Sequence, residues 1–294
     1  MEEQLRSHGQ GATFLELSAN ALASCPIAVP ALSAQQEIAD YLDIETARID
    51  ALISKKRCLI ELFDERSRAL HDEWYERLLS AHGPITIRRL SHDIEQGWSP
   101  VCDSEPANNE EWGVIQTSAV SSGRFRADNN KRLPSTAIRT KRWLLHDGDL
   151  LVTRGSGSRS MVGRACVASV GGRTLTLSDL VYRVKLIKAA PEFVSAALQS
   201  SPVRAQIESS IRSDAGLTLK IRRDDLADVR IPAVPLRFQA SETASLTKVV
   251  GLLHEAGLGV EKQIALLTER RQALITTVVT GEIPMSRLRH KSRD

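Results

Sequence analysis

The sequence predicts a mixed α/β domain together with two long helices that pair as an antiparallel coiled coil. Three observations lead to this fold class. The two ends of the 294-residue chain repeat each other at a constant offset, both repeats carry a heptad spacing of apolar residues, and the segment between them has short β-rich runs separated by polar loops. Because 42% of the residues are hydrophobic and 26% are charged, the chain can fill a core and keep a charged surface.

The repeat sets each residue opposite the one 204 positions later. The stretch LFDERSRALH at 62–71 shares five of its ten residues with LLTERRQALI at 266–275, and the same offset aligns IAVPALSAQ at 27–35 with IPAVPLRFQ at 231–239. Each copy opens with prolines, which exclude a helix and favour an extended connector. The chain therefore contains two copies of a unit that consists of a proline-containing connector and a long helix.

Apolar residues at every seventh position predict a coiled-coil seam in both helices. The residues that flank the seam of the first helix on the adjoining position are Ile38, Leu52, Ile53, Leu59, Ile60 and Trp74. About forty-five residues at roughly 1.5 Å each predict a rod of roughly 65 Å. In the second helix, Gly251, Gly257 and Gly259 predict a bend or a local loosening, since glycine costs about 1 kcal/mol relative to alanine in a helix interior. The predicted seam residues are Leu42, Ile49, Phe63, Leu70, Leu246, Leu253, Val260, Leu267 and Leu274.

The middle of the chain, residues 84–235, has the pattern of a strand-rich domain that ends in helices. Pro191 favours the start of a helix, because proline fits the first helical turn. Asp147 and Asp149 are interpreted as part of a turn, and Asp224 and Asp225 as the cap of a short helix. The predicted strands lie at 85–90, 112–117, 149–154, 163–169 and 180–187, and the predicted helices at 191–200 and 202–211.

The sequence carries no pattern typical of a catalytic or metal site. Its four cysteines stand far apart without CxxC or Cys/His spacing, which predicts neither a zinc site nor a disulfide framework. Phosphate-loop, nucleophile-elbow, HExxH and Asn-Pro-Pro-aromatic motifs are missing. No run approaches the roughly 18 apolar residues of a membrane span, and no secretory signal precedes the first repeat. The expectation is a cytoplasmic protein that is not an enzyme and holds no cofactor or metal of its own.

Positive charge is concentrated in the middle domain, where 22 Lys and Arg residues stand against 16 Asp and Glu. Four basic loops, at 121–132, 139–143, 150–165 and 216–225, mix these cations with Ser, Thr or Asn, the residues that bind phosphates and read bases. For the loop at 150–165 a flexible hairpin tip is the alternative, but four such loops on one domain favour DNA binding. The candidate DNA-binding residues are Arg124, Arg126, Asn129, Asn130, Lys131, Arg132, Lys141, Arg142, Arg154, Ser156, Ser158, Arg159, Thr218, Lys220, Arg222 and Arg223.

Several of these stretches resemble parts of the specificity subunit of type I restriction-modification systems. IAVPALSAQQEIADYLDIETARIDALISKK at 27–56 resembles the central conserved region of that family. GDLLVTRGSGS at 148–158 resembles the strand and loop of its target recognition domains, and GLTLKIRRDDLADVRIPAVP at 216–235 resembles the end of such a domain. The closing stretch ERRQALITTVVTGEI at 269–283 extends the resemblance over roughly residues 11–283.

The resemblance implies a subunit that reads DNA and performs no chemistry itself. In the family, two target recognition domains each read half of a split DNA sequence, and the paired helices form a spacer that holds them apart. The implied partners are double-stranded DNA, methylation subunits and restriction subunits, with no membrane. S-adenosylmethionine, ATP and Mg would belong to those partner subunits. Glu269, Arg270 and Arg271 are expected to face outward, where a methylation subunit could dock.

The chain departs from the family pattern at its first domain. GATFLELSANAL at 11–22 resembles the stump of a target recognition domain, with only ten residues before it. A truncated gene, one half of a split subunit and a half-subunit that homodimerises all remain open, as does a non-catalytic scaffold whose middle domain binds protein. The target sequence is not fixed by one chain. The expected divisions are a domain remnant and connector at 1–32, a conserved helix at 33–83, the recognition domain at 84–235, a second conserved helix at 236–283 and a basic tail at 284–294.

Overall fold

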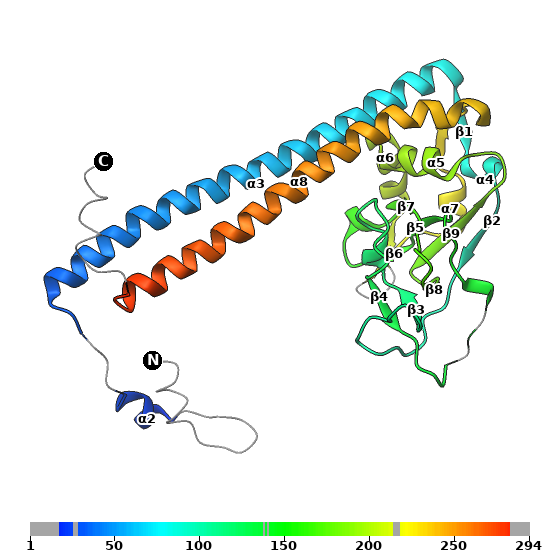
Figure 1. Cartoon of the computed structure of the whole chain (residues 1–294). Helices are drawn as coiled ribbons and strands as arrows, with labels where there is room; N and C mark the ends of the chain where they lie inside the picture. The colour runs from blue at the N-terminus through cyan, green and yellow to red at the C-terminus, as the bar shows by residue number, and fades with distance from the viewer. Residues whose placement is uncertain (1–17, 26–28, 138, 140, 214–217, 283–294) are drawn as a thin grey trace. The chain divides into compact units, whose positions relative to one another are not determined.

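The computed structural model describes residues 18–25, 29–137, 139, 141–213 and 218–282 (Figure 1). The expected basic tail at 284–294 and most of the expected remnant at 1–32 lie outside the described residues. Within that remnant, Ala19–Ala23 forms the short helix α2, whose N-cap Ser18 accepts a hydrogen bond from the amide of Ala21 at 3.2 Å. The chain divides into two compact units, residues 1–57 with 261–294 and residues 58–260, and each is described by itself.

Two long helices contribute to both units. Helix α3 spans Leu32–His82 and helix α8 spans Leu236–Val279, so their first residues stand at the predicted offset of 204. In the first unit the two helices run antiparallel, since Lys56 binds Gln263 while Asp50 lies within 3.0 Å of Arg271. The predicted antiparallel pair is therefore confirmed there. Arg271, which was predicted to face outward, reaches across the pair to Asp50, and the side chains of this ion pair are 37% and 53% exposed.

The second unit contains the other ends of the same helices, again antiparallel. The indole Nε1 of Trp74 donates to the carbonyl oxygen of Glu242 at 2.9 Å, and Arg77 forms an ion pair with the Glu242 carboxylate at 2.7 Å. These contacts hold α3 and α8 in a fixed register beside the β-rich domain of this unit.

The residues of the predicted seam are all buried or half-buried along α3 and α8. On the adjoining position Ile53 and Trp74 are buried, whereas Leu52 is 48% exposed and Leu59 is 38% exposed. An α-helix has 3.6 residues per turn, so seven residues fall about 20° short of two full turns. The buried stripe therefore shifts to a neighbouring heptad position along the helix.

Helix α8 spans Leu236–Val279 and includes the three glycines for which a bend or local loosening was predicted. Gly251 has a packing role. Its carbonyl oxygen accepts a hydrogen bond from Arg124 at 3.4 Å, and a Cβ at this position would lie 3.3 Å from the same nitrogen. A residue without a side chain therefore lets the Arg124 guanidinium approach the helix backbone.

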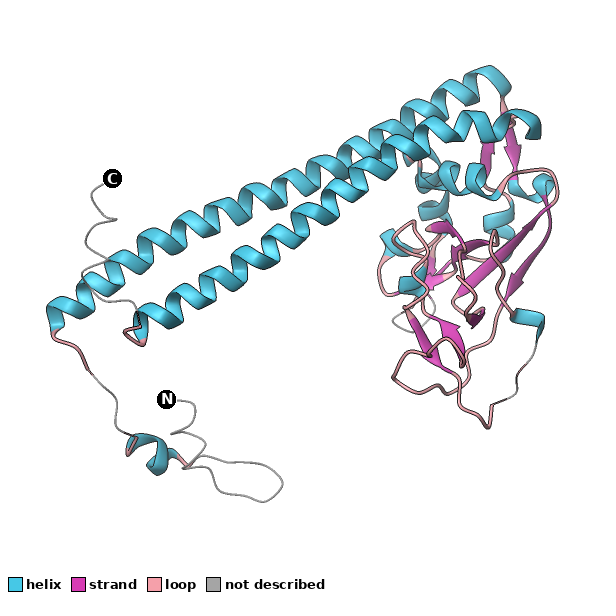
Figure 2. Cartoon of the chain, viewed as in Figure 1, coloured by secondary structure: helices cyan, strands magenta, loops and turns pink. Residues whose placement is uncertain are grey.

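The strands of the second unit form several small sheets (Figure 2). The largest is antiparallel in the order β2-β9-β5-β7, with bounds Ser91–Gln96, Val181–Leu186, Leu150–Thr153 and Ala165–Val167. A second sheet, β4-β3-β8, joins Asn130–Arg132, Trp112–Ile115 and Thr174–Thr176, with β3 and β8 parallel. The third, β10-β11-β6, joins Arg212–Ser213, Leu219–Lys220 and Gly155–Ser156, and the fourth pairs β1, Pro84–Thr86, with β12, Arg230–Pro232.

Strand β5 separates two hydrophobic cores, because successive side chains of a strand point to opposite faces. Leu150 and Val152 belong to the core that packs against α3, where the rings of Trp74 and Phe193 meet edge to face at 5.3 Å. Leu151 belongs to a second core on the other face. A strand buried on both faces appears as a continuous apolar run, which is why 149–154 was recognisable in the sequence.

The predicted elements of the middle domain are found with one exception. The five predicted strands correspond to β1, β3, β5, β7 and β9, and the two predicted helices correspond to α5, Pro191–Gln199, and α6, Ser201–Ser210. The exception is 85–90, where strand β1 ends at Thr86 and the short helix α4, Ile87–Leu90, follows. Ile87 donates its amide hydrogen to the carbonyl oxygen of Val229 at 3.0 Å, and both Ile87 and Leu90 are buried. Three-residue spacing of the two apolar side chains fits one helical turn.

Candidate nucleic-acid interface

Two basic segments that are far apart in the sequence meet at one pocket of the second unit. The pocket has a volume of about 240 Å³. Its lining combines the end of strand β5 with strands β10 and β11 and the start of the short helix α7, Arg223–Ala227. The lining residues are Arg154, Tyr182, Arg212, Lys220, Ile221, Arg222 and Arg223. Of the candidate DNA-binding residues, the structure thus brings Arg154, Lys220, Arg222 and Arg223 together.

The pairing of strands β6 and β11 joins the two segments. Lys220 lies opposite Gly155 in the antiparallel register of these strands. A Cβ on Gly155 would lie 3.0 Å from Leu180, 3.2 Å from the Lys220 stem and 3.3 Å from the Thr218 methyl group. Glycine therefore permits a close approach that places Arg154 and Lys220 at the same pocket.

Arg154 is held in place by the groups around it. Its Nε donates to the hydroxyl oxygen of Tyr182 at 3.2 Å, and its Nη1 donates to the carbonyl oxygen of Asp179 at 3.3 Å. The guanidinium carbon lies 5.9 Å from the centre of the Tyr182 ring, within cation–π range. The Tyr182 hydroxyl in turn donates to the carbonyl oxygen of Ile221 at 3.2 Å. The pocket wall therefore has a defined geometry before any ligand enters.

The described residues of the pocket lining include five cations. Two acids of the adjacent helix, Asp224 and the C-cap residue Asp228, bind Arg88 of α4 at 3.3 and 2.9 Å. These hydrogen bonds raise the pKa of Arg88 above its usual value. The concentration of cations in the lining favours an anionic ligand.

Sequence reasoning missed two polar lining residues, Arg212 and Tyr182, besides the apolar Ile221. Arg212 lies in the two-residue strand β10, just before the basic loop at 216–225, and no loop composition marks it. Tyr182 lies inside the predicted strand 180–187, where an aromatic residue fits a core position as well. Only the pairing of β10 with β11 and of β5 with β9 brings them to the pocket.

The loop at 121–132 uses several of its polar groups internally. Asn130 is buried, and its amide accepts from Ala107 and donates to Ala127, both at 2.8 Å. Asn129 donates to the carbonyl oxygen of Ser118 at 3.2 Å. Arg132 forms an ion pair with Asp103 at 2.8 Å, which raises the pKa of Arg132. These contacts give Asn130 and Arg132 a structural role, while Arg126 and Lys131 are exposed.

The loop at 150–165 extends from the pocket toward helix α6. Arg159 donates to the carbonyl oxygen of Glu208 at 2.9 Å and does not line the pocket. The Ser156 hydroxyl accepts from the amide of Ser158 at 3.2 Å. Arg154 and Arg159, which the sequence placed in one loop, therefore lie in different surroundings.

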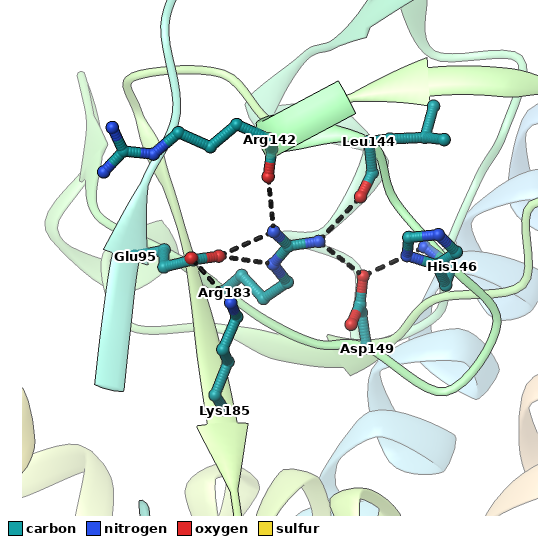
Figure 3. A network of polar contacts seen from close by, with 7 residues as sticks. All are labelled: Glu95, Arg142, Leu144, His146, Asp149, Arg183 and Lys185. Carbon is teal, nitrogen blue, oxygen red and sulfur yellow. Dashed lines mark hydrogen bonds and ion pairs between the residues drawn. The ribbon is translucent and has the colours of Figure 1, made fainter. Parts of the chain in front are cut away.

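A buried arginine, Arg183, fixes the basic segment 141–146 (Figure 3). Its Nε and Nη2 bind the Glu95 carboxylate at 2.9 and 2.6 Å, and its Nη1 binds Asp149 at 3.1 Å. The remaining donors reach the carbonyl oxygens of Arg142 at 2.9 Å and Leu144 at 2.7 Å. Burial tends to lower the pKa of Arg183, but these bonds to Glu95 and Asp149 outweigh burial and raise it.

The Arg183 network leaves the Arg142 side chain pointing away from it, as Figure 3 shows. The Arg142 guanidinium lies 5.8 Å from the ring centre of Trp143, which stacks on Trp98 at 6.0 Å. Lys141 beside it is exposed. The network therefore positions a second basic surface, Lys141 and Arg142, which does not line the pocket.

Within residues 18–282, apart from the gaps given above, no group of three or more His, Cys, Asp or Glu side chains could hold a metal ion. In the same part of the chain, no helix is both long and apolar enough to cross a membrane. The fold and the pocket thus define a class of protein in which a basic, β-rich domain is inserted between two helices of one repeat.

Comparison with known proteins shows which proteins the chain is similar to. No family model matches the chain. The EcoEI type I restriction enzyme specificity subunit of Escherichia coli is 33% identical over 156 residues, which cover 52% of this chain and 26% of that protein. The EcoKI specificity subunit of Escherichia coli K12 is 21% identical over 271 residues, which cover 87% of this chain and 57% of that protein. The chain thus spans about a quarter of the length of the EcoEI subunit and somewhat over half of the length of the EcoKI subunit.

A solved structure that concerns complex assembly and conformational transition of the type I R-M system contains a chain of the same fold. The TM-score is 0.56 at 16% identity, over 96% of this chain and 68% of that one. The resemblance seen in the sequence is confirmed, and the chain is a relative of the specificity subunits of type I restriction enzymes.

Proposed function

We propose that the chain is a DNA specificity subunit of a type I restriction-modification complex. In this proposal the domain at 84–235 binds duplex DNA and reads one half of a bipartite target. The observation that supports it most is the pocket, where Arg154 and Lys220 from separate basic segments converge with three further cations. Such a surface suits the phosphate-rich backbone of DNA. The relationship to two specificity subunits supports the same conclusion.

The proposal assigns the chain no chemical step. Helices α3 and α8 would dock methylation subunits, which would bring S-adenosylmethionine, and restriction subunits would bring ATP and Mg. Exposed Glu269 and Arg270 remain candidates for that docking, whereas Arg271 is occupied by Asp50. A second copy of this chain or a different half-subunit would supply the other half-site reader. The complex would work in the cytoplasm, where its DNA lies.

The first test is the methylation pattern of the host genome with and without the gene. If two copies of the chain associate, two identical domains read identical half-sites, and the methylated sequence should be an interrupted palindrome. An asymmetric bipartite sequence would instead require a second, different recognition domain. No sequence whose methylation depends on the gene would contradict the proposed function.

A mobility-shift assay separates the two arginines of the loop at 150–165. We expect Arg154→Ala to weaken binding to duplex DNA by about tenfold, because it removes a charged donor from the pocket. Arg159→Ala should have a smaller effect, since its guanidinium is engaged by Glu208. Unchanged affinity in both variants would exclude a role for this loop in DNA binding. Binding without salt dependence would favour the alternative, a scaffold whose domain binds protein.

A further inference from the structure

Arg204 of helix α6 is buried, yet it makes few good hydrogen bonds. Its side chain is only 9% exposed. Its Nη2 donates to the carbonyl oxygen of Ser160 at 3.3 Å and lies 3.6 Å from the Glu208 carboxylate. Among the residues that the structure describes, no hydrogen-bond partner reaches its Nη1. Because a buried charged donor without a partner is unfavourable, the fold retains Arg204 for its charge and not for the hydrogen bonds it makes.

Arg164 brings a second guanidinium to the same place. Its Nε donates to the carbonyl oxygen of Ser160 at 3.1 Å, the acceptor that Arg204 also uses, and its Nη1 donates to the side-chain oxygen of Gln199 at 3.0 Å. Gly163 permits this approach, since its φ is +74° and a Cβ there would lie 3.2 Å from Nη1 of Arg204. Two like charges therefore share one neutral acceptor.

The charge of these two arginines is only partly balanced by the acids near them. Burial and the charge of Arg164 lower the pKa of Arg204 to about 10, although Glu208 opposes this shift. Burial also lowers the pKa of Arg164, although Glu208 and Asp64 oppose that shift, and Arg68 of helix α3 adds to it. An additional negative group would stabilise the charged form of both arginines. Arg68, Arg164 and Arg204 together form the Arg204 site.

The Arg204 site opens to solvent beside a strand that leads to the pocket. Arg68 and Ser160 are exposed, and Arg164 is half-buried. The amide of Thr153 donates to the carbonyl oxygen of Arg164 at 2.8 Å, and Thr153 precedes Arg154 of the pocket. The two basic sites therefore begin on adjacent residues of the paired backbone. Duplex DNA, with one negative charge per about 1.7 Å of its axis, suits two neighbouring basic sites better than a single carboxylate of a protein does.

We infer that the Arg204 site binds a phosphate of the DNA backbone. Arg68 and Arg164 contact the phosphate, and the charge of the buried Arg204 strengthens that contact. The inference rests on the proposed function and extends it, because the DNA-binding surface then includes helices α3 and α6 as well as the basic loops. The contribution to affinity is the same for every base sequence, since phosphates carry no sequence information.

The first experiment measures the affinity of the full chain for two duplexes of unrelated sequence as a function of salt concentration. We expect Arg68→Gln and Arg164→Gln each to bind both duplexes about tenfold more weakly at low salt. The slope of log affinity against log salt should become shallower, by about 0.9 if the phosphate contact is lost entirely.

Arg66→Gln is the matched control for Arg68→Gln. Arg66 is an exposed arginine of the same helix, and its ion pair with Glu73 at 3.7 Å is open to solvent. Two residues along a helix correspond to a rotation of about 200°, so Arg66 points away from the Arg204 site. The affinity and the salt slope of Arg66→Gln should therefore match those of the wild type.

Arg204→Met separates a binding role from a structural one. Methionine fills much of the space of the arginine side chain and removes the buried charge together with its unpaired donor. The urea concentration at the unfolding midpoint should equal that of the wild type or rise, whereas the affinity for both duplexes should fall by about threefold to tenfold. A lower midpoint would make Arg204 a structural residue, as Arg183 is, and would contradict the inference.

Other results would overturn the inference as a whole. If Arg68→Gln and Arg164→Gln bind DNA as Arg66→Gln does, the site does not contact DNA, although the proposed function stands. Loss of affinity on only one of the duplexes would assign the site to a base. Variants that keep their DNA affinity but no longer bind a methylation subunit would assign it to a carboxylate of a protein partner. A wild-type chain that binds neither duplex would reject the proposed function itself, and the inference with it.

Discussion

The middle domain contains two clusters of arginines that differ in how their charge is balanced. Arg183 is 5% exposed, and its five donors reach two carboxylates and two carbonyl oxygens. The pocket around Arg154 and Arg222 collects five cations without a carboxylate in its lining. Both clusters use strands β5 and β9 or the segments next to them. The sequence alone gives no reason to treat their arginines differently.

The difference teaches how to separate structural cations from binding cations. A buried guanidinium stabilises a fold only when its donors are all used, because an unpaired buried charge is strongly unfavourable. A partly exposed cation without an acid partner needs no such compensation from the protein and keeps its donors for a ligand. By this criterion Arg183 stabilises the fold and positions the segment 141–146, whereas Arg222, which lines the pocket, is a candidate for contact with DNA.

The largest predicted effect is the loss of stability in Arg183→Met. The substitution leaves Asp149 and the carbonyl oxygens of Arg142 and Leu144 without their buried donor, and should lower the free energy of unfolding by about 3–5 kcal/mol. Urea unfolding measures that loss. Limited trypsin digestion measures its location, since faster cleavage after the exposed Lys141 or Arg142 would show that the segment has loosened.

Arg173→Met provides the matched control for Arg183→Met. Arg173 pairs with Asp128 at 2.6 Å, but the Asp128 side chain is 83% exposed. A pair this open to solvent contributes only about 0–1 kcal/mol. Equal losses of stability in the two variants would contradict a special role for the Arg183 network.

A second, smaller effect concerns the pH dependence of the same network. Burial raises the pKa of Glu95, but hydrogen bonds from Lys185 and Arg183 outweigh burial and lower it below the usual value. Folding therefore keeps Glu95 ionised, so its contribution is present above a pH of about 4.3 and is lost as pH falls through the lowered pKa. We expect Glu95→Gln to cost about 1–3 kcal/mol at neutral pH, and the difference from wild type to shrink in acid.

Urea unfolding, measured from neutral pH down to about pH 3, tests the Glu95 prediction. The lower limit lies below the usual pKa of a carboxyl group. Glu192→Gln is the control, because Glu192 is an exposed residue at the start of α5. Its difference from wild type should stay constant over the same range. A Glu95→Gln difference that also stays constant would mean that ionisation of Glu95 contributes nothing to stability.

Much of the fold followed from the sequence because its signals are local or repeated. The 204-residue offset located both helix starts, and the apolar run at 149–154 located a strand buried on both faces. The short strands β6, β10 and β11 could not be predicted, because two residues carry no period. The pocket depends on those strands, so the sequence supplied Arg154 and Lys220 as separate candidates but not their meeting with Arg212.

The same reasoning explains which candidate residues the structure places elsewhere. Asn130 and Arg132 have the composition of a DNA-binding loop, yet their partners Ala107 and Asp103 lie more than twenty residues away in the sequence. A residue type shows which hydrogen bonds are possible, and only the fold shows which are already made. Their role toward DNA stays a prediction that mobility-shift assays of single variants can test.

The smallest predicted effect is the change in stability when a cation of the pocket is removed. Arg222→Gln should change the free energy of unfolding by no more than about 0.5 kcal/mol, because the Arg222 side chain lines the pocket and completes no buried network such as that of Arg183. At low salt any change should be a gain, since one of five mutually repelling cations is removed. Raising the salt shortens the Debye length to about 10 Å at 0.1 M and about 3 Å at 1 M, which should abolish that gain. Urea unfolding at the two salt concentrations measures it. A loss approaching that of Arg183→Met would place the pocket cations in the same class as Arg183, and the criterion that separates structural from binding arginines in this domain would fail.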